Sequence, residues 1–315
     1  RIIREMLANR SAKRTQRLLN DSLILLSKGD MRRAKKKLKS ASSTNHPILQ
    51  SFLLNIEMSI DSGDIAESHN WVKKASSKLP EVKDYIYLFA SKLLIDAECF
   101  TDARSYVDEL IESNPKNPAA NQLLFEILKD TRDYDLILRK IFEFTDYIND
   151  DELAQTIHSL VKEAIKDQKP TKTIFERIPR SIDKHPMIIT SKIEAWIDNK
   201  EYLKAETELR KQIPNNWNKE LIILYAELGE DNLNGLSERV DKWLEERPKD
   251  ANLWLVASRL AQKDGLWSKA QQCIERSIEI KPVSEAYTEL ALILSELGEK
   301  EQASEALKLA RQTSG

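Results

Sequence analysis

Apolar residues recur at intervals of three and four along every long segment of the chain, which is the period of a helix with one buried face. We therefore expect more than about 70% helix and no sheet. The helices fall into about nine pairs. Their first helices are expected to begin near residues 15, 49, 84, 118, 152, 186, 217, 251 and 284.

Three sets of residues repeat at a common spacing of roughly 34 residues. Prolines, which cannot donate to a further helical turn, are expected to stop second helices: Pro47, Pro80, Pro115, Pro214, Pro248 and Pro282. Glycines are expected to end first helices: Gly29, Gly63, Gly265 and Gly298. Mostly small residues are expected where the helices cross: Ala34, Ser68, Ala103, Ile137, Thr171, Ala205, Ala270 and Ala303.

This spacing resembles the tetratricopeptide repeat, a helix–turn–helix unit that stacks on its neighbours. We therefore predict an all-α fold, a tetratricopeptide-like right-handed superhelix of about nine helix pairs. The clearest copy runs from Asn252 to Pro282. In it Trp254 fills the space between helices, and Ala257 and Ala270 allow a close crossing.

The repeat is weakest from Asp151 to Lys184, where Pro170 and Pro179 should confine the second helix to a short piece. We divide the chain into four segments on this basis. They are basic N-terminal helices with the first repeat (1–46), repeats two to four (47–150), a degenerate repeat (151–185) and C-terminal repeats (186–315).

Composition adds little chemistry to this picture. Cys99 and Cys273 are far apart, so we expect two buried apolar side chains rather than a disulfide or a zinc site. No apolar run has the ~18–20 residues of a membrane span. Because the sequence begins with Arg1, we expect a piece of a longer protein, from which an N-terminal anchor could be missing.

The sequence contains no recognisable catalytic motif. His46, His69, His158 and His185 are scattered without metal-ligand spacing, so structural or surface roles are expected. A glycine-rich phosphate loop, a nucleophile elbow and a Cys/His arrangement are all missing. We expect no enzyme activity, no catalytic residues, no metal and no cofactor.

The net charge of −2 conceals a basic N-terminal region, because residues 1–40 hold 13 Lys and Arg but only 3 Asp and Glu. That region contains no aromatic residue to stack on bases, so no nucleic-acid partner is expected. We predict an anionic membrane surface as the partner, with a solvated face as the alternative. The residues assigned to this membrane-proximal surface are Arg10, Lys13, Arg14, Arg17, Arg32, Arg33, Lys35, Lys36 and Lys37.

A family resemblance rests on the same region. The basic stretch Ala12-Lys13-Arg14-Thr15 leads into a leucine-rich run ending in Gly29-Asp30, followed by Ala34 and Leu38. This pattern resembles the opening of the soluble part of the proteobacterial HemY family. The C-terminal copy resembles that family too, through Trp254, Gly265-Leu266-Trp267 and Lys281-Pro282.

The resemblance covers essentially the whole chain. It implies an inner-membrane protein with two N-terminal transmembrane helices that are missing here and a repeat domain in the cytoplasm. It also implies a link to protohaem biosynthesis, with tetrapyrrole-synthesis enzymes as partners, and it brings no catalytic residues.

A partner-binding groove is expected on the first helices, which should point their second, fifth, ninth and twelfth residues into the concave face. Counting from the predicted starts selects Gln50, Glu57, Tyr85, Lys92, Gln122, Glu126, Lys129, Glu194, Asn218, Tyr225, Asn252, Arg259 and Gln262. Tyr225, Asn252 and Arg259 are expected to form the most discriminating patch, because Tyr and Arg often dominate interface energies.

These observations favour a non-catalytic protein-interaction scaffold tethered to the membrane. One alternative is a soluble co-chaperone-like module that grips peptides, although Lys92, Asn218, Asn252 and Arg259 lack the clamp arrangement. The other is a carrier that binds porphyrin or haem directly.

Overall fold

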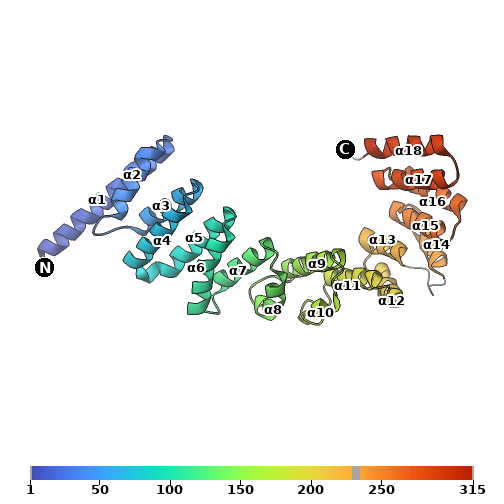
Figure 1. The fold of residues 1–315 in the computed structure, drawn as a ribbon, viewed down its shortest axis with the longest axis horizontal. Helices are drawn as coiled ribbons and strands as arrows, with labels where there is room; N and C mark the ends of the chain where they lie inside the picture. The colour runs from blue at the N-terminus through green and yellow to red at the C-terminus, as the bar shows by residue number, and fades with distance from the viewer. Residues whose placement is uncertain (1, 229–234, 314–315) are drawn as a thin grey trace. The chain divides into compact units, whose positions relative to one another are not determined.

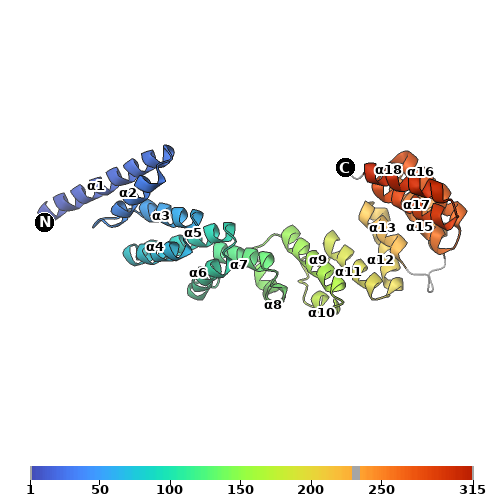
Figure 2. The same cartoon turned by 45° about the horizontal axis from the view of Figure 1, so that its top comes forward.

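The computed structural model describes residues 2–228 and 235–313, with side chains from residue 10 onward. The chain is 78% helical, and no strand occurs among the residues described. Within those ranges eighteen α-helices form nine consecutive pairs. Figures 1 and 2 show these helices in two views. The predicted all-α fold of about nine tetratricopeptide-like pairs is thus confirmed.

The helices form two compact units, residues 1–149 and residues 150–315. The four-segment division made from the sequence stays a prediction. The first unit contains α1 (Ile2–Ser27), α2 (Met31–Ser42), α3 (Leu49–Asp61), α4 (Ile65–Lys78), a 3-10 turn (Pro80–Val82), α5 (Lys83–Asp96), α6 (Phe100–Ser113), α7 (Pro118–Asp130) and α8 (Tyr134–Phe144).

The second unit contains the remaining five pairs. They are α9 (Asp150–Lys166), α10 (Lys172–Phe175), α11 (Pro186–Asp198), α12 (Tyr202–Asn215), α13 (Lys219–Glu227), α14 (Leu236–Glu246), α15 (Ala251–Lys263), α16 (Trp267–Ile280), α17 (Ser284–Glu296) and α18 (Lys300–Gln312). Most first helices begin within two residues of the predicted positions. The first is the exception, because α1 begins well before residue 15.

One backbone turn ends the first helix of eight pairs. The second residue after the helix has a positive φ, which bends the chain back toward the second helix. After α1, for example, the amide of Asp30 donates to the Leu25 carbonyl (2.9 Å) and that of Gly29 to Leu26 (2.9 Å). Four of these residues are the predicted Gly29, Gly63, Gly265 and Gly298. The other four are Glu98, Arg132, Gln168 and Lys200.

The predicted crossing positions are buried throughout. Ala34, Ala103, Ala205 and Ala270 are completely inaccessible to solvent, and Ala303 is 8% exposed. Ser68, Ile137 and Thr171 are buried at the same register in the other pairs.

The fifth pair is degenerate, as predicted. Its second helix, α10, has only four residues, between Pro170 and Pro179. The proline prediction is wrong at Pro214, which lies inside the last turn of α12 rather than beyond its end.

Two further sequence expectations have different outcomes. Cys273 is buried as expected, but Cys99 is only half-buried, because it lies at the N-terminal end of α6 beside a turn. Within the described ranges, no helix combines the length and the apolar character needed to cross a bilayer.

Candidate partner-binding surface

The first helices α3, α5 and α7 pack against one another in the first unit. Their predicted groove residues are accessible to different degrees. Four are exposed: Gln50, Tyr85, Lys92 and Gln122. Three are half-buried: Glu57, Glu126 and Lys129.

Helix α5 presents an aromatic and cationic stripe. Tyr85, Phe89 and Lys92 lie at spacings of four and three residues, so they share one face. Tyr85 is 53% exposed. The centroid of its ring lies 6.5 Å from that of Phe89, with 24° between the ring planes. Ile86, Ala90 and Leu94 occupy the opposite face and are fully buried, which fixes the rotation of the helix. We call Tyr85, Phe89 and Lys92 the α5 stripe.

In the second unit the predicted groove residues are engaged within the chain. The Arg259 guanidinium lies 2.7 Å from a Glu289 oxygen and 3.0 Å from a Glu285 oxygen, both on α17. Gln262 also donates to Glu289, at 3.2 Å. Burial lowers the pKa of Arg259, but the two carboxylates outweigh burial and raise it overall. Arg259 therefore links α15 to α17.

Asn218 has a capping role, because its side-chain oxygen accepts from the Leu221 amide at 2.9 Å at the start of α13. Asn252 is half-buried in the first turn of α15, where its amide donates to the capping side chain of Asp250 at 2.9 Å. Neither residue forms an exposed patch with Arg259.

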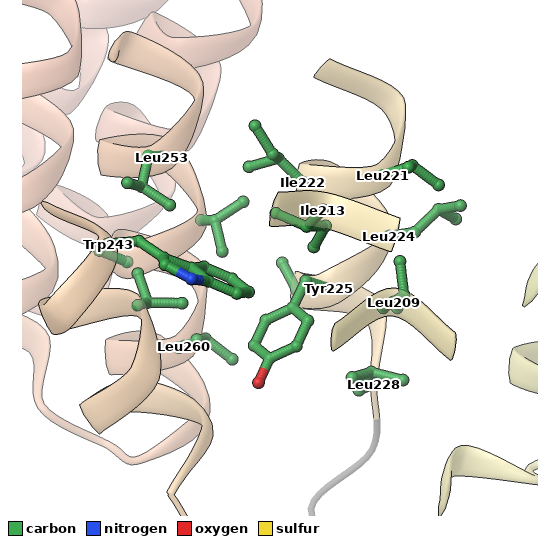
Figure 3. Close-up of a cluster of buried hydrophobic side chains, with 14 of the residues drawn as sticks. Leu209, Ile213, Leu221, Ile222, Leu224, Tyr225, Leu228, Trp243, Leu253 and Leu260 are labelled. Carbon is green, nitrogen blue, oxygen red and sulfur yellow. The ribbon is translucent and has the colours of Figure 1, made fainter. Parts of the chain in front are cut away.

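The assignment of Tyr225 to the groove is wrong. Its side chain is completely buried, and its ring packs 5.0 Å from that of Trp243, as Figure 3 shows. Leu209, Ile213 and Leu260 belong to the same cluster. Burial, helped by the charge of Glu206, raises the pKa of Tyr225 to about 12.

Glu194 is half-buried between first helices. It lies on α11, 3.6 Å from the His158 ring nitrogen and 3.7 Å from the Lys162 ammonium, both on α9. Burial raises the pKa of Glu194, and Glu220 and Glu227 add to this effect against the attraction of Lys162. Burial likewise lowers the pKa of His158, whose Nδ1 lies 2.8 Å from the Ser191 hydroxyl. This cluster disfavours charge on both groups.

We expect Glu194→Gln to stabilise the second unit at pH 7 by on the order of 1 kcal/mol. The folded-state pKa of Glu194 lies above its ordinary value of 4.5, so the ionised side chain lowers stability at neutral pH. Both states are protonated below that value, so the gain should vanish at about pH 4. Urea unfolding at both pH values measures it. An exposed control, Glu296→Gln, should change little; equal gains at both sites would contradict the explanation.

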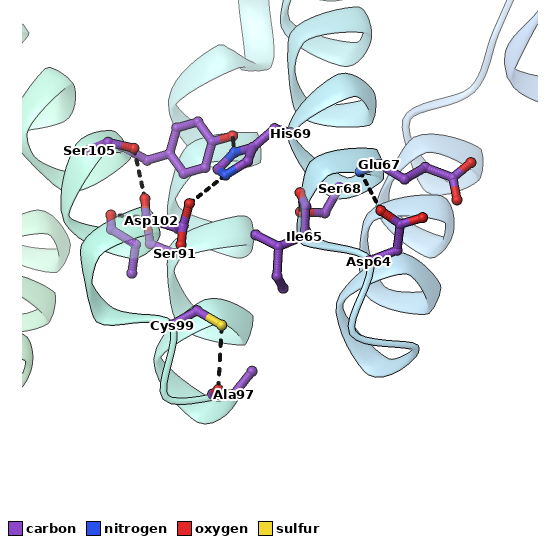
Figure 4. A network of polar contacts seen from close by, with 12 residues as sticks. Asp64, Ile65, Glu67, Ser68, His69, Ser91, Ala97, Cys99, Asp102 and Ser105 are labelled. Atoms are coloured by element: carbon purple, nitrogen blue, oxygen red, sulfur yellow. Dashed lines mark hydrogen bonds and ion pairs between the residues drawn. The ribbon is translucent and has the colours of Figure 1, made fainter.

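Polar side chains one repeat apart join neighbouring pairs. His69 on α4 binds Asp102 on α6 through Nε2 at 2.7 Å, and its other ring nitrogen hydrogen-bonds the Tyr106 hydroxyl (Figure 4). His69 and Asp102 are 33 residues apart. His185 and Asp151 form a similar link at 2.9 Å across 34 residues. These links were not predicted, although the separation between each histidine and its acidic partner matches the repeat length.

These links are structural. Tyr106 is only 8% exposed, and burial raises its pKa further above the ordinary value of 10, so the hydroxyl is held neutral. In the part of the chain that the structure describes, no group of three or more His, Cys, Asp or Glu residues could hold a metal ion.

The short α10 leaves a cavity of about 400 Å³ beside α11. Phe175, Trp196 and Ala195 contribute its apolar wall. The Lys192 ammonium at its edge is bound to Asp183 at 2.5 Å. No histidine lines this cavity, so it offers no imidazole ligand to a porphyrin metal.

The first helix pair displays the predicted basic residues. Arg10, Lys13, Arg14 and Arg17 are exposed on α1, opposite the buried Thr15 and Leu19. On α2, Arg32, Arg33 and Lys36 are exposed, and Lys35 and Lys37 are half-buried. Three of them have partners within the unit: Arg33 with Asp30 at 3.3 Å, Lys37 with Asp21 at 3.1 Å, and Lys35 with the Ser62 hydroxyl at 3.2 Å.

No protein-family model and no curated protein matches the chain. Among solved structures it is similar to a tetratricopeptide repeat protein from Parabacteroides merdae, with 16% identity and a TM-score of 0.41 over 85% of this chain and 93% of that one. It is also similar to human IFIT1, solved as a dimer with PPP-AAAA (16% identity, TM-score 0.37, 91% of this chain and 66% of that one). A third similar structure is a chain of the APC/C hetero-tetramer Cut9-Hcn1, with 15% identity and a TM-score of 0.35 over 95% of this chain and 66% of that one. At these identities and TM-scores the likenesses carry no conclusion about partner or activity.

Proposed function

We propose that the protein is a non-catalytic interaction scaffold that binds a protein partner on the first-helix face of residues 1–149, at the α5 stripe. The observation that carries this proposal is Tyr85, a residue 53% exposed on a first helix with a fully buried opposite face. Tyrosine is one of the residue types that most often dominate interface energies. The scaffold needs no chemistry of its own.

We further propose that the scaffold works at the cytoplasmic face of an inner membrane and gathers enzymes of tetrapyrrole biosynthesis. The resemblance to the HemY family supports the second part. The exposed basic residues of α1 and α2 support the first, because clustered Lys and Arg attract anionic lipid headgroups.

The residues of the family resemblance also have local structural roles. Gly29 has φ +75°, and the Asp30 side chain accepts from the Arg33 amide at 3.1 Å to begin α2. Gly63 and Asp64 repeat this arrangement before α4, where the Asp64 side chain accepts from Glu67 at 2.9 Å. The Gly-Asp pair is therefore a repeat-turn signal, and the tetrapyrrole link depends on the resemblance as a whole.

Replacing Tyr85 and Lys92 by Ala together should weaken partner recovery at least tenfold and leave the melting temperature nearly unchanged. Both side chains are exposed, so their loss removes interface contacts without opening the core. Recovery is measured by affinity purification of the full-length protein from its native membrane, with quantitative mass spectrometry.

The matched control is Phe142→Ala with Arg139→Ala, an exposed aromatic ring and an exposed cation on the second helix α8 of the same unit. It should recover partners normally. Recovery that survives loss of the α5 stripe but not of this control would reject the proposed surface. If the recovered partners include no enzyme of tetrapyrrole biosynthesis, the proposed link to that pathway is rejected and the proposed binding surface is not.

A further inference from the structure

Exposed apolar side chains are concentrated near the end of α1 and the start of α2. Leu23 is 37% exposed, Ile24 54% and Met31 48%, and all three lie within nine residues of sequence. The other large apolar residues found exposed lie singly, each on or beside a different helix: Tyr85, Phe142, Leu203, Leu266, Leu292 and Leu307. We call Leu23, Ile24 and Met31 the apolar tip. Figure 1 shows the turn at the end of α1 away from the N-terminus.

Positive charge surrounds the apolar tip. Residues 10–42 contain eleven Lys and Arg but only two carboxylates, Asp21 and Asp30. Lys28 lies in the turn itself, and Arg32 and Arg33 follow Met31 directly. On α1, Ile24 continues the face of Arg10, Arg14 and Arg17, because these residues recur at helical spacings. The opposite end of the repeat array differs: the exposed residues of α18 have mixed charge, with Glu301 and Glu305 beside Lys308 and Arg311.

We propose that the apolar tip inserts into the interface of an anionic bilayer while the basic residues of α1 and α2 bind its headgroups. This inference rests on the membrane part of the proposed function and adds the depth and orientation of contact. An element with an apolar edge and a cationic rim is suited to the headgroup–acyl boundary, where both sources of affinity act together.

The same features disfavour nucleic acid as the partner. Contacts with phosphates would explain the positive charge, but the sugar-phosphate backbone of a nucleic acid offers no apolar environment to Leu23, Ile24 and Met31. Residues 1–40 also contain no aromatic side chain to stack on bases.

The test uses the 315-residue chain with sonicated vesicles of phosphatidylcholine, alone or mixed with phosphatidylglycerol. We expect co-sedimentation to increase with the anionic lipid and to be lost at about 1 M salt, where screening reaches ~3 Å. Leu23→Gln/Ile24→Gln/Met31→Gln should bind anionic vesicles about tenfold more weakly at low salt with an unchanged melting temperature. The control Phe142→Gln/Leu203→Gln/Leu266→Gln removes three apolar groups elsewhere that are on average more exposed, and it should bind like the parent.

A second readout measures depth. An environment-sensitive dye on Ile24→Cys, in a Cys99→Ser/Cys273→Ala background, should shift to the blue on anionic vesicles, whereas the same dye on Leu203→Cys should not. If the parent chain does not bind anionic vesicles, the membrane part of the proposed function is rejected, and this inference is rejected with it. If it binds but the tip variant binds equally and the dye does not shift, only the inference fails. Tighter binding to a single-stranded RNA oligonucleotide than to vesicles, unaffected by the tip variant, would overturn it in favour of nucleic acid.

Discussion

Tyr225→Ala should destabilise the second unit by about 3–5 kcal/mol, the usual cost of removing a fully buried aromatic ring. The ring contributes to a core that joins α12, α13, α14 and α15, so its loss leaves a cavity among four helices. In a unit of this size the loss corresponds to a melting temperature lower by about 10 °C. Differential scanning calorimetry of the full chain measures the melting temperature of the second unit.

Tyr225→Phe is the matched control, because it keeps the ring and removes only the hydroxyl. Among the described residues that hydroxyl has no hydrogen-bond partner of normal geometry, although Arg239 lies near it and lowers its pKa against the effect of burial, so stability at pH 7 should change by less than about 1 kcal/mol. The variants should diverge in alkali. The folded-state pKa of about 12 exceeds the ordinary value of 10, so the parent loses the stability contributed by neutral Tyr225 as the pH rises from 10 to 12. The Phe variant lacks this loss. If the Tyr225→Ala variant melted at the same temperature as the parent, the burial of Tyr225 in this core would be contradicted.

Replacing Glu98, Arg132, Gln168 and Lys200 together by Gly should stabilise the chain by about 2–4 kcal/mol in total. Each has a positive φ, between 54° and 58°, in the turn where other pairs have glycine. A side chain in this conformation costs roughly 1–2 kcal/mol, of which the greater flexibility of unfolded glycine returns a part. Two of the sites lie in each unit, so both unfolding transitions should move to higher denaturant.

Two controls separate backbone strain from a general effect of glycine. Lys73→Gly, at an exposed position within α4, should destabilise by about 1 kcal/mol because its backbone is helical. Gly265→Ala should be destabilising although a methyl group there would meet nothing within 4 Å, since φ is +71°. A quadruple variant that is no more stable than the parent would show that these turns are unstrained.

The repeat was predictable because its signals are local. Proline, glycine and small residues act within one turn or one helix crossing, so their spacing fixes the helix pairs before any packing is known. The long α1 was missed since residues 2–14 carry little of the repeat pattern, and four of the positive-φ turns were missed because no glycine marks them.

The assignment of Tyr225 to the groove failed for a rotational reason. The sequence placed the start of the seventh first helix at residue 217, but α13 begins at Lys219. Two residues correspond to about 200° of helical rotation, so the expected inward position turned into the core and carried Tyr225 with it. Counted from Lys219, the second and ninth residues are Glu220 and Glu227, and both are exposed. The ion pairs that engage Arg259 involve residues of the next repeat, which spacing within one helix does not reveal.

The polar links between residues one repeat apart give the array a fixed order. His69 finds its carboxylate only in the following pair, and His185 finds Asp151 only in the preceding one. Trp217 likewise donates to Asp250, 33 residues further on, at 2.7 Å. A repeat cut out, duplicated or moved would keep its own fold signals and lose the neighbour that its polar groups match. Each of these helix pairs therefore has polar groups that match one particular neighbour. The repeats of this chain cannot be exchanged for one another as identical repeats could.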